Sequence, residues 1–523
     1  MVRTFAAIDV GSFELEIGIY EMSGKSGFRE IDHVRHVIAL GRDTFNEGKI
    51  SYELVEELCQ VLTDFARLMK TYQVEDYRAY GTSAMREAKN SQIVLDQVRV
   101  RTGFDIKVIS NSEQRFISYK AIAAKDAEFQ KTIQQSTAIV DVGYGSMQIS
   151  LFDKDALVST QNLPLGVLRM REMLSGIRVT GKARLNLMSE MVDNELIIFR
   201  KMYLKDRPIS NLIGIGDAIR TLAYKMRPEM AEGQRKDRIT LEEFSRFFDR
   251  IKSMTTEQLE EIFDVDHEYA TMMLPTVVIY KRIMETTGAG VMWIPGIQMT
   301  DGIAAEYAES NKILKFNHKF DNDIIVTSRN MGKRYKCPMP HVQAVEKMAL
   351  KIFDSVKKYH GLKSRERLLL QIAANLHSCG EFVTVRGASD CAYNIIMATE
   401  IIGLSHVERE LVANVVRYQG QTFRYNEVDI EARPSRYTRL ATPVNLIMIV
   451  AKLTAILQLA DSMDRSHKAK LENSRITVKD NQLIITTEYE GDVTLENMSI
   501  QQRVDFFEEI FGIRPLLKQK KKV

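Results

Sequence analysis

The sequence predicts a layered α/β region built from two related halves, followed by a helical domain and a small mixed α+β domain. Three observations support this fold class. Strand and helix patterns alternate through the first part of the chain. A strand–glycine-turn–strand unit near the N-terminus is repeated from residue 138. Beyond about residue 325, apolar residues recur at helical spacing.

The first half, for which we expect residues 1–135, opens with two strands in residues 4–20 around a tight turn at Gly11 and Ser12. Helical and strand patterns then alternate, as expected for a sheet covered by helices. In order, they are a helix at 51–70, a strand and turn at 76–85, a helix at 91–103, a strand at 105–110 and a helix from about Ser112.

The second half, expected over residues 136–315, repeats the opening unit. "AAIDVGSFELEIGIY" and "AIVDVGYGSMQISLF" share D-V-G, a serine after the turn and an apolar exit strand. Such a turn can direct successive backbone N–H groups at one anion, and the serine adds a hydroxyl donor. We therefore expect the halves to face each other and to offer both loops to one phosphate-binding cleft.

The rest of the chain has a different pattern of apolar residues, typical of helices. We expect a boundary at about 310–335, a helical domain over 330–470 and a C-terminal α+β domain over 471–523, with a hairpin turning at Asp480–Asn481. The expected helices are residues 341–362, 365–380, 391–402, 405–419, 444–464 and 501–512. Residues 227–238 are expected to form a surface loop, and the basic run Lys518–Lys522 a solvated tail.

Composition narrows the function classes. The net charge of +3 gives no general reason for nucleic-acid binding, so any anion site must be local. No apolar run reaches about 18 residues, which argues against a membrane span. The four cysteines form no C-x-x-C pair, so we expect neither a disulfide scaffold nor a zinc ribbon. We expect the protein to lie in the reducing cytoplasm.

These motifs resemble the exopolyphosphatase / guanosine pentaphosphate phosphatase (Ppx/GppA) family. Matching stretches occur in family order along nearly the whole chain: "AAIDVGSFELEIGIY", "GTSAMREAKN", "IKVISNSEQRFISYKAI", "AIVDVGYGSMQISLF", "LPLGVLRMRE", "VVRYQ" and "LADSMDRSHKAKL". The resemblance implies a duplicated actin-like (RNase H-like, ASKHA) region and an HD-like helical domain. It also implies removal of the terminal phosphate of polyphosphate or guanosine pentaphosphate, with Mg²⁺, by a homodimer.

The resemblance also implies which residues form the site. The expected phosphate-binding residues are Asp9, Gly11, Ser12, Ser83, Arg86, Asp141, Gly143, Gly145, Ser146 and Arg169. Of these, Asp9 and Asp141 could also hold Mg²⁺ through their carboxylates. Arg86 and Arg169 follow small-residue turns, from which a guanidinium could clamp a phosphate.

The chain departs from the family where catalysis is expected. Gln114 and Gln148 replace two glutamates, Phe13 replaces the asparagine of the first loop, and Tyr144 interrupts the second. An amide cannot take a proton from water, and losing a positioned base typically costs about 10²–10⁴-fold in rate. In one interpretation the chain is a hydrolase, in which Glu113 serves as the base or Gln114 merely orients the attacking water. In the other, the cleft is a polyphosphate or (p)ppGpp sensor that cuts its ligand slowly or not at all. The loss of two carboxylates favours the sensor.

A third hypothesis, an actin-like ATPase or kinase, lacks an adenosine-pocket signature. In the helical domain His341 and His377 remain, but Ser378 and Gln419 stand where metal-binding HD domains have aspartate and histidine. Because two imidazoles alone make a poor divalent site, we expect no metal there. A domain-locking ion-pair network is expected instead, among Asp461, Asp464, Arg465 and His467.

Overall fold

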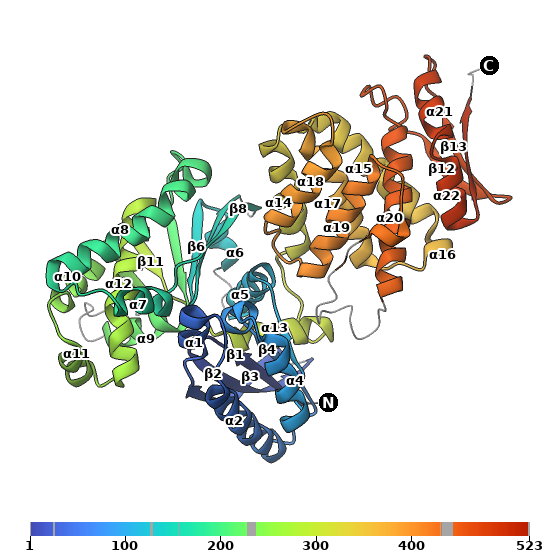
Figure 1. Cartoon of the computed structure of the whole chain (residues 1–523). Helices are drawn as coiled ribbons and strands as arrows, with labels where there is room; N and C mark the ends of the chain where they lie inside the picture. Colours follow the sequence, from blue (N-terminus) through green and yellow to red (C-terminus); the bar gives the residue numbers. More distant parts are fainter. Residues whose placement is uncertain are drawn as a thin grey trace. The chain divides into compact units, whose positions relative to one another are not determined.

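The computed structural model describes residues 2–24, 27–125, 129–154, 156–226, 237–428, 430 and 443–520. The chain divides into two compact units, Met1–Lys319 and Phe320–Val523 (Figure 1). The division falls inside the polar interval 310–335. Most of the expected surface loop, residues 227–236, lies outside the described residues.

A five-stranded sheet in the order β3-β2-β1-β4-β5 organises the first half. Its strands are β1 (Arg3–Val10), β2 (Glu14–Ser23), β3 (Gly27–Val37), β4 (Asp76–Gly81) and β5 (Ile106–Val108). The helices are α1 (Leu40–Glu47), α2 (Tyr52–Thr71), α3 (Ser83–Glu87), α4 (Ser91–Thr102) and α5 (Asn111–Lys125). The strands and helices expected here are confirmed. Strand β3 was missed because it is an edge strand without fully buried residues.

The second half has a six-stranded sheet in the order β10-β11-β9-β6-β7-β8. The strands are β6 (Thr137–Val142), β7 (Met147–Asp153), β8 (Ala156–Leu163), β9 (Asn211–Ile215), β10 (Arg238–Thr240) and β11 (Val291–Trp293). Strand β6 pairs antiparallel with β7 and parallel with β9, as β1 does with β2 and β4. The internal duplication is therefore confirmed in the strand topology.

Helices cover the second sheet, and one of them returns to the first half. They are α6 (Phe129–Ile133), α7 (Val167–Ser175), α8 (Gly181–Phe199), α9 (Asp217–Met226), α10 (Leu241–Ile251), α11 (Thr256–Phe263), α12 (His267–Thr287) and α13 (Met299–Ser310). Helix α13 packs on the first half, where Ile303 and Ala304 share a core with Phe5 and Tyr20. The two halves thus interlock through a helix that follows both sheets in the chain.

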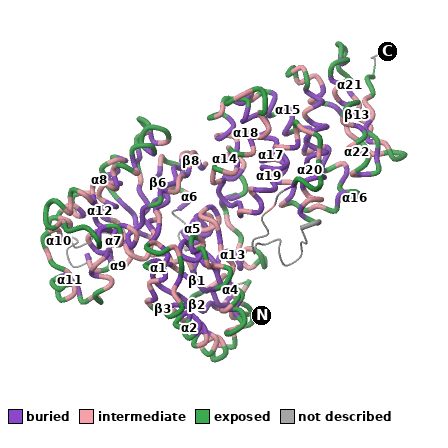
Figure 2. The backbone as a smooth tube through the Cα atoms, viewed as in Figure 1, coloured by how far each residue is buried: buried purple, intermediate pink, exposed green. Residues whose placement is uncertain are grey.

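The second unit begins with a helical layer (Figure 1). Its helices are α14 (Phe320–Arg334), α15 (Met339–Ser355), α16 (Lys357–His360), α17 (Ser364–Leu376), α18 (Ala388–Ala398), α19 (His406–Gln419) and α20 (Pro443–Ser462). The expected single helix at 341–362 is two helices that meet at Val356. Helix α20 contains the stretch Asn445–Ser462, which is long and apolar enough to cross a membrane, but 67% of it is buried. Figure 2 shows this burial along α20, as in a core helix.

The unit ends in a three-stranded sheet, β12-β13-β14, with two helices. These elements are β12 (Arg475–Lys479), β13 (Gln482–Thr487), α21 (Thr494–Gln501), α22 (Val504–Phe511) and β14 (Arg514–Gln519). The expected hairpin is confirmed, with positive φ at Asp480 and Asn481 as a tight type I′ turn requires. The tail prediction is wrong at Lys518, which lies in β14 and pairs with Thr486. Residues 521–523 lie outside the described residues.

Candidate functional site

The two glycine turns converge on one pocket in the first unit, and they share a backbone pattern. The N–H of Gly11 donates to the carbonyl of Glu14 at 3.0 Å, and the N–H of Gly143 donates to Ser146 at 3.0 Å. Both turns line the same pocket. The Ser12 and Ser83 hydroxyl oxygens lie 2.9 Å apart. The duplicated sequence therefore produces two equivalent turns that face one space.

Most of the residues named from the sequence line this pocket. Those that do are Asp9, Gly11, Ser12, Ser83, Gln114, Asp141, Gly143, Ser146 and Gln148. They come from the ends of β1 and β6, the two turns, the starts of α3 and α5, and the start of β7. The structure thus brings together residues that are more than 130 positions apart in the chain.

Arg86, Gly145 and Arg169 do not line the pocket but shape its walls. Arg86 donates to the carbonyl of Ile109 at 2.7 Å, which ties α3 to the start of α5. Arg169 donates through Nε to the carbonyl of Gly145 at 2.7 Å. A Cβ on Gly145 would lie 2.7 Å from Ser83 Oγ, so only glycine lets the second turn approach the first half this closely.

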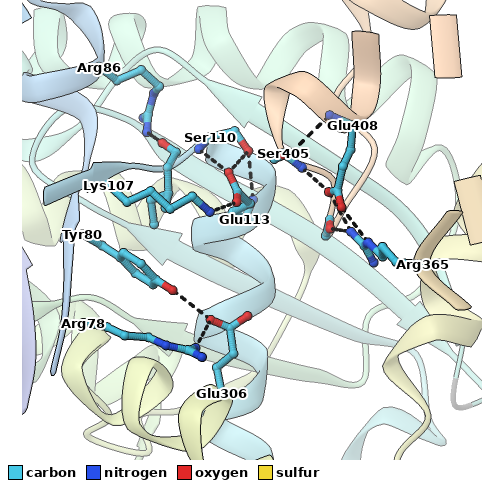
Figure 3. Close-up of polar contacts among 12 residues, drawn as sticks. Arg78, Tyr80, Arg86, Lys107, Ser110, Glu113, Glu306, Arg365, Ser405 and Glu408 are labelled. Atoms are coloured by element: carbon cyan, nitrogen blue, oxygen red, sulfur yellow. Dashed lines mark hydrogen bonds and ion pairs between the residues drawn. The ribbon is translucent and has the colours of Figure 1, made fainter. Parts of the chain in front are cut away.

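Glu113 is held outside the pocket lining, in the cap of α5 (Figure 3). Its carboxylate accepts the backbone N–H of Ser110 at 3.0 Å and pairs with Lys107 Nζ at 2.6 Å. The Ser110 hydroxyl in turn accepts the N–H of Glu113 at 3.2 Å. This reciprocal capping box satisfies backbone donors at the helix start. The structure does not bring Glu113 to the position expected of a base.

Gln148 is engaged by a buried cation that the sequence analysis did not single out. Arg115 is 1% exposed, and its Nε donates to Gln148 Oε1 at 2.9 Å. Asp141 lies nearby and accepts the Ser118 hydroxyl at 3.1 Å. Burial raises the pKa of Asp141, while the Ser118 hydrogen bond and the Arg115 charge oppose that rise.

A cluster of carboxylates that the sequence analysis missed also lines the pocket: Glu14, Glu16 and Asp217. Their ligand atoms all lie within 4.8 Å of one another. Glu14 and Glu16 are two positions apart on β2, so both point to the same face of the sheet. Asp217 begins α9 directly after Gly216, whose φ is +123°. The sequence signal was two acidic residues alternating within an otherwise apolar strand beside the first turn.

The cluster is electrostatically crowded. Glu14 is 3% exposed, and both of its carboxylate oxygens are buried without a hydrogen-bond partner in the described part of the chain. Burial, followed by the charges of Asp217 and Glu16, raises the pKa of Glu14 to about 9. Burial and Glu16 likewise raise the pKa of Asp217 to about 7. Burial raises the pKa of Asp9 well above its usual range.

Two cationic side chains offset part of this charge at Glu16. His33 and Arg220 lie 3.8 and 3.6 Å from its Oε1, beyond hydrogen-bond distance. Burial alone would raise the pKa of Glu16, but these neighbours outweigh it and lower the pKa. These two cations leave both carboxylate oxygens of Glu14 without a hydrogen-bond partner in the described part of the chain. Buried carboxylate oxygens converging from two elements fit a hard divalent cation, which binds oxygen ligands.

The two aromatic departures from the family pattern contact each other. The rings of Phe13 and Tyr144 lie 4.9 Å apart, and Phe13 packs edge-on against Tyr269 at 5.5 Å. Phe13 belongs to the hydrophobic core of the second half although it lies in the first loop. The phenylalanine therefore anchors the first turn to the opposite half.

In the second unit, Asp461 and Asp464 of the expected network do form ion pairs, but with His341, which that expectation did not include. His341 Nδ1 lies 2.8 Å from Asp464 Oδ2, and His341 Nε2 lies 3.2 Å from Asp461 Oδ1. His467 stacks on the His341 ring at 3.8 Å. His377 joins the same cluster, 3.2 Å from His341. The sequence-based premise that the two imidazoles lack a carboxylate is wrong, because α20 brings Asp461 to them.

Comparisons with known proteins agree with this architecture. The profile of the Ppx/GppA phosphatase family matches residues 19–306, and that of its domain III matches residues 325–503. Guanosine-5'-triphosphate,3'-diphosphate pyrophosphatase of Photobacterium profundum is 22% identical over 489 residues, 92% of this chain and 91% of that protein. The same-named protein of Vibrio atlanticus is 21% identical over 92% of this chain and 91% of its own length.

Solved structures show the same fold over the N-terminal part. A Ppx/GppA family member from Aquifex aeolicus has a TM-score of 0.50 at 21% identity, covering 61% of this chain and 100% of its own. An exopolyphosphatase from Cytophaga hutchinsonii has a TM-score of 0.53 at 17% identity, covering 60% and 99%. With two matched turns, one shared pocket and a family profile spanning more than half its length, the chain belongs to the Ppx/GppA phosphatase family.

Proposed function

We propose that the pocket removes the terminal phosphate of polyphosphate or of guanosine pentaphosphate with the help of a divalent cation. One observation carries this proposal: two phosphate-sized glycine turns and five carboxylates line the same pocket. Relatives that match over about nine-tenths of the chain bear the name of a guanosine pentaphosphate pyrophosphatase. Their name supports the substrate class.

The turns supply the phosphate grip. Backbone N–H groups and the hydroxyls of Ser12 and Ser146 can donate to phosphate oxygens. When ionised, the acidic side chains Asp9, Glu14, Glu16, Asp141 and Asp217 would repel a polyanion. A divalent cation bound by some of them would offset that negative charge.

The residues present fit Mg²⁺. Glu14, Glu16 and Asp217 would hold the ion, because Glu14 offers two buried oxygens without partners in the described chain. When bound, such an ion neutralises charge on the transferring phosphoryl group. Asp9 and Asp141 flank the ion site from the two turns, where the resemblance also places metal contacts.

The chain's own groups must receive the proton of the attacking water. Gln114 and Gln148 carry amides, and Glu113 is engaged in its cap. The proton therefore goes to Asp9 or Asp141, the two pocket carboxylates that would not hold the ion; burial raises the pKa of both and so favours their protonated form. In this proposal the acidic groups lie at other positions of the pocket than in the family pattern, so the base is replaced and not simply lost.

The sensor hypothesis stays as the second candidate, favoured by the two amides in the pocket lining. In that case the pocket would bind the anion and leave it intact, as expected where no side chain takes the proton of water. The helical unit would then transmit whether the pocket is occupied by the anion.

The cysteines Cys59, Cys337, Cys379 and Cys391 are all free thiols, which supports placing the chain in a reducing cytoplasm.

The test is phosphate release from polyphosphate and from guanosine pentaphosphate by the purified full-length chain with Mg²⁺. We expect turnover by the wild type, loss of at least about 10²-fold in Glu14→Gln and Asp217→Asn, and near wild-type turnover in Glu113→Gln. Glu113→Gln is the matched control, since it removes the same charge outside the pocket. A silent wild type that gains activity in Gln114→Glu would establish the sensor instead.

A further inference from the structure

A second cluster of ligand atoms lies in the other unit, outside the pocket described above. Three side chains from α15, the end of α17 and α20 meet there: His341, His377 and Asp461. His341 is 4% exposed and His377 is 7% exposed. Asp461 is half-buried, with a side chain 16% exposed, and is the most exposed of the three.

The hydrogen bonds on the far side of each ring fix where the lone pairs point. His377 Nδ1 lies 2.7 Å from the carbonyl of Ala374, which can only accept, so Nδ1 carries the hydrogen. His341 Nδ1 lies 2.8 Å from the carboxylate of Asp464 and donates to it in the same way. In the neutral rings, both Nε2 atoms are therefore lone-pair acceptors.

Three acceptors then face one another. The two Nε2 atoms are 3.2 Å apart, and Asp461 Oδ1 lies 3.2 Å from His341 Nε2 and 3.7 Å from His377 Nε2. Three lone-pair atoms this close repel unless a cation lies between them. In the metal-free chain a proton on His341 supplies that charge: burial lowers the pKa of His341, but Asp461 and Asp464 outweigh it and raise that pKa to about 9. A metal ion bound between the three atoms would take the place of this proton.

The spacing matches a metal ion. At metal–ligand distances of about 2.1 Å, tetrahedral ligands lie about 3.4 Å apart, and the three observed separations bracket that value. The contacts behind the rings are those that ligating histidines commonly make, a carboxylate for one ring and a backbone carbonyl for the other.

We propose that His341, His377 and Asp461 form a three-ligand site for a divalent transition metal, with Asp464 orienting His341. Two imidazoles with one carboxylate favour Zn²⁺, Fe²⁺ or Co²⁺ over Mg²⁺, which prefers oxygen ligands. Three protein ligands leave at least one position for water or a ligand oxygen, as in open metal sites. The site is chemically distinct from the all-carboxylate cluster of the pocket.

The test is a titration of the metal-free full-length chain with Co²⁺, read by its visible absorption, followed by competition with Zn²⁺. We expect one equivalent of Co²⁺ to give a nitrogen-ligand spectrum that Zn²⁺ removes. Affinity should fall by at least about 10²-fold in His377→Gln and Asp461→Asn. It should fall about 10–100-fold in Asp464→Asn, which keeps all three ligands.

Two control variants separate this site from other metal binding. Glu14→Gln disables the pocket cluster, and His360→Gln removes another buried histidine of the same unit; both should bind Co²⁺ as the wild type does. Absence of the spectrum in the wild type would overturn the proposal without reference to any variant. So would a spectrum that persists in folded His377→Gln and Asp461→Asn, with folding checked by circular dichroism.

Discussion

Replacing Glu14 by glutamine should stabilise the metal-free protein while it removes function. The folded chain raises the pKa of this carboxyl from its ordinary value of 4.5 to about 9. The folded state therefore holds a proton at neutral pH that the unfolded state releases. The stability tied to this proton is fully present below pH 4.5 and is lost as pH rises toward 9.

The magnitude follows from the distance between pH 7 and the ordinary pKa. A gap of about 2.5 pH units at about 1.36 kcal/mol each makes ionisable Glu14 cost about 3 kcal/mol at pH 7. A glutamine has no proton to capture. Its amide leaves unpaired polar atoms in the same place as protonated Glu14 does. The glutamine variant should therefore gain most of the roughly 3 kcal/mol that ionisable Glu14 costs the wild type. We expect Glu14→Gln to raise the free energy of unfolding by about 2 kcal/mol without metal.

The assay is thermal and denaturant unfolding at pH 7 in chelator, then with Mg²⁺. The single tryptophan, Trp293, lies buried in β11, so its fluorescence reports on the first unit alone. Because an ion that binds only the folded state stabilises it by mass action, Mg²⁺ should raise the melting temperature of the wild type and leave Glu14→Gln almost unchanged. A variant less stable than the wild type in chelator, or equal Mg²⁺ shifts in both, would refute the reasoning.

Three further outcomes are expected. Glu113→Gln should weaken the cap of α5 and lower stability by about 0.5–2 kcal/mol, with an unchanged KM for polyphosphate; a large loss of kcat would contradict its placement. Gly145→Ala should weaken phosphate binding, because its Cβ would meet Ser83 and Phe45 at 2.7 Å; isothermal titration with polyphosphate measures this, and wild-type affinity would count against the turn as the grip. Gln114→Glu should change kcat by less than about tenfold if the pocket carboxylates already accept the proton, and steady-state phosphate release measures it.

Much of the fold was visible in local pattern. The strands on either side of Gly11, the repeat at Asp141 and the helices from 341 onward follow from periodicity and turn residues alone. Strands β3 and β14 were not predicted because they are edge strands with polar or basic faces. Their apolar and polar residues alternate too weakly to distinguish them from loops. The break between α15 and α16 was not predicted because the helical spacing of apolar residues continues across Val356.

The candidate site was predicted less completely. The match between the two turns predicted Ser12 and Ser146 in one pocket, and the resemblance to the family motifs singled out Gln114 and Gln148. The resemblance to the family motifs also suggested Glu113 as the base, yet a glutamate at the third position of a helix after a serine is the pattern of a capping box. That local pattern predicts a structural role for Glu113, and the contacts of Glu113 with Ser110 and Lys107 agree with it.

The sequence by itself determined the duplicated α/β architecture, the paired glycine turns and the family, because these depend on backbone geometry over a few residues. Tertiary structure alone decided which charged groups meet. Glu14 and Asp217 come from different halves, and Asp461 reaches His341 across 120 positions of chain. Such encounters depend on how sheets and helices pack, and no local pattern of residues encodes that distance.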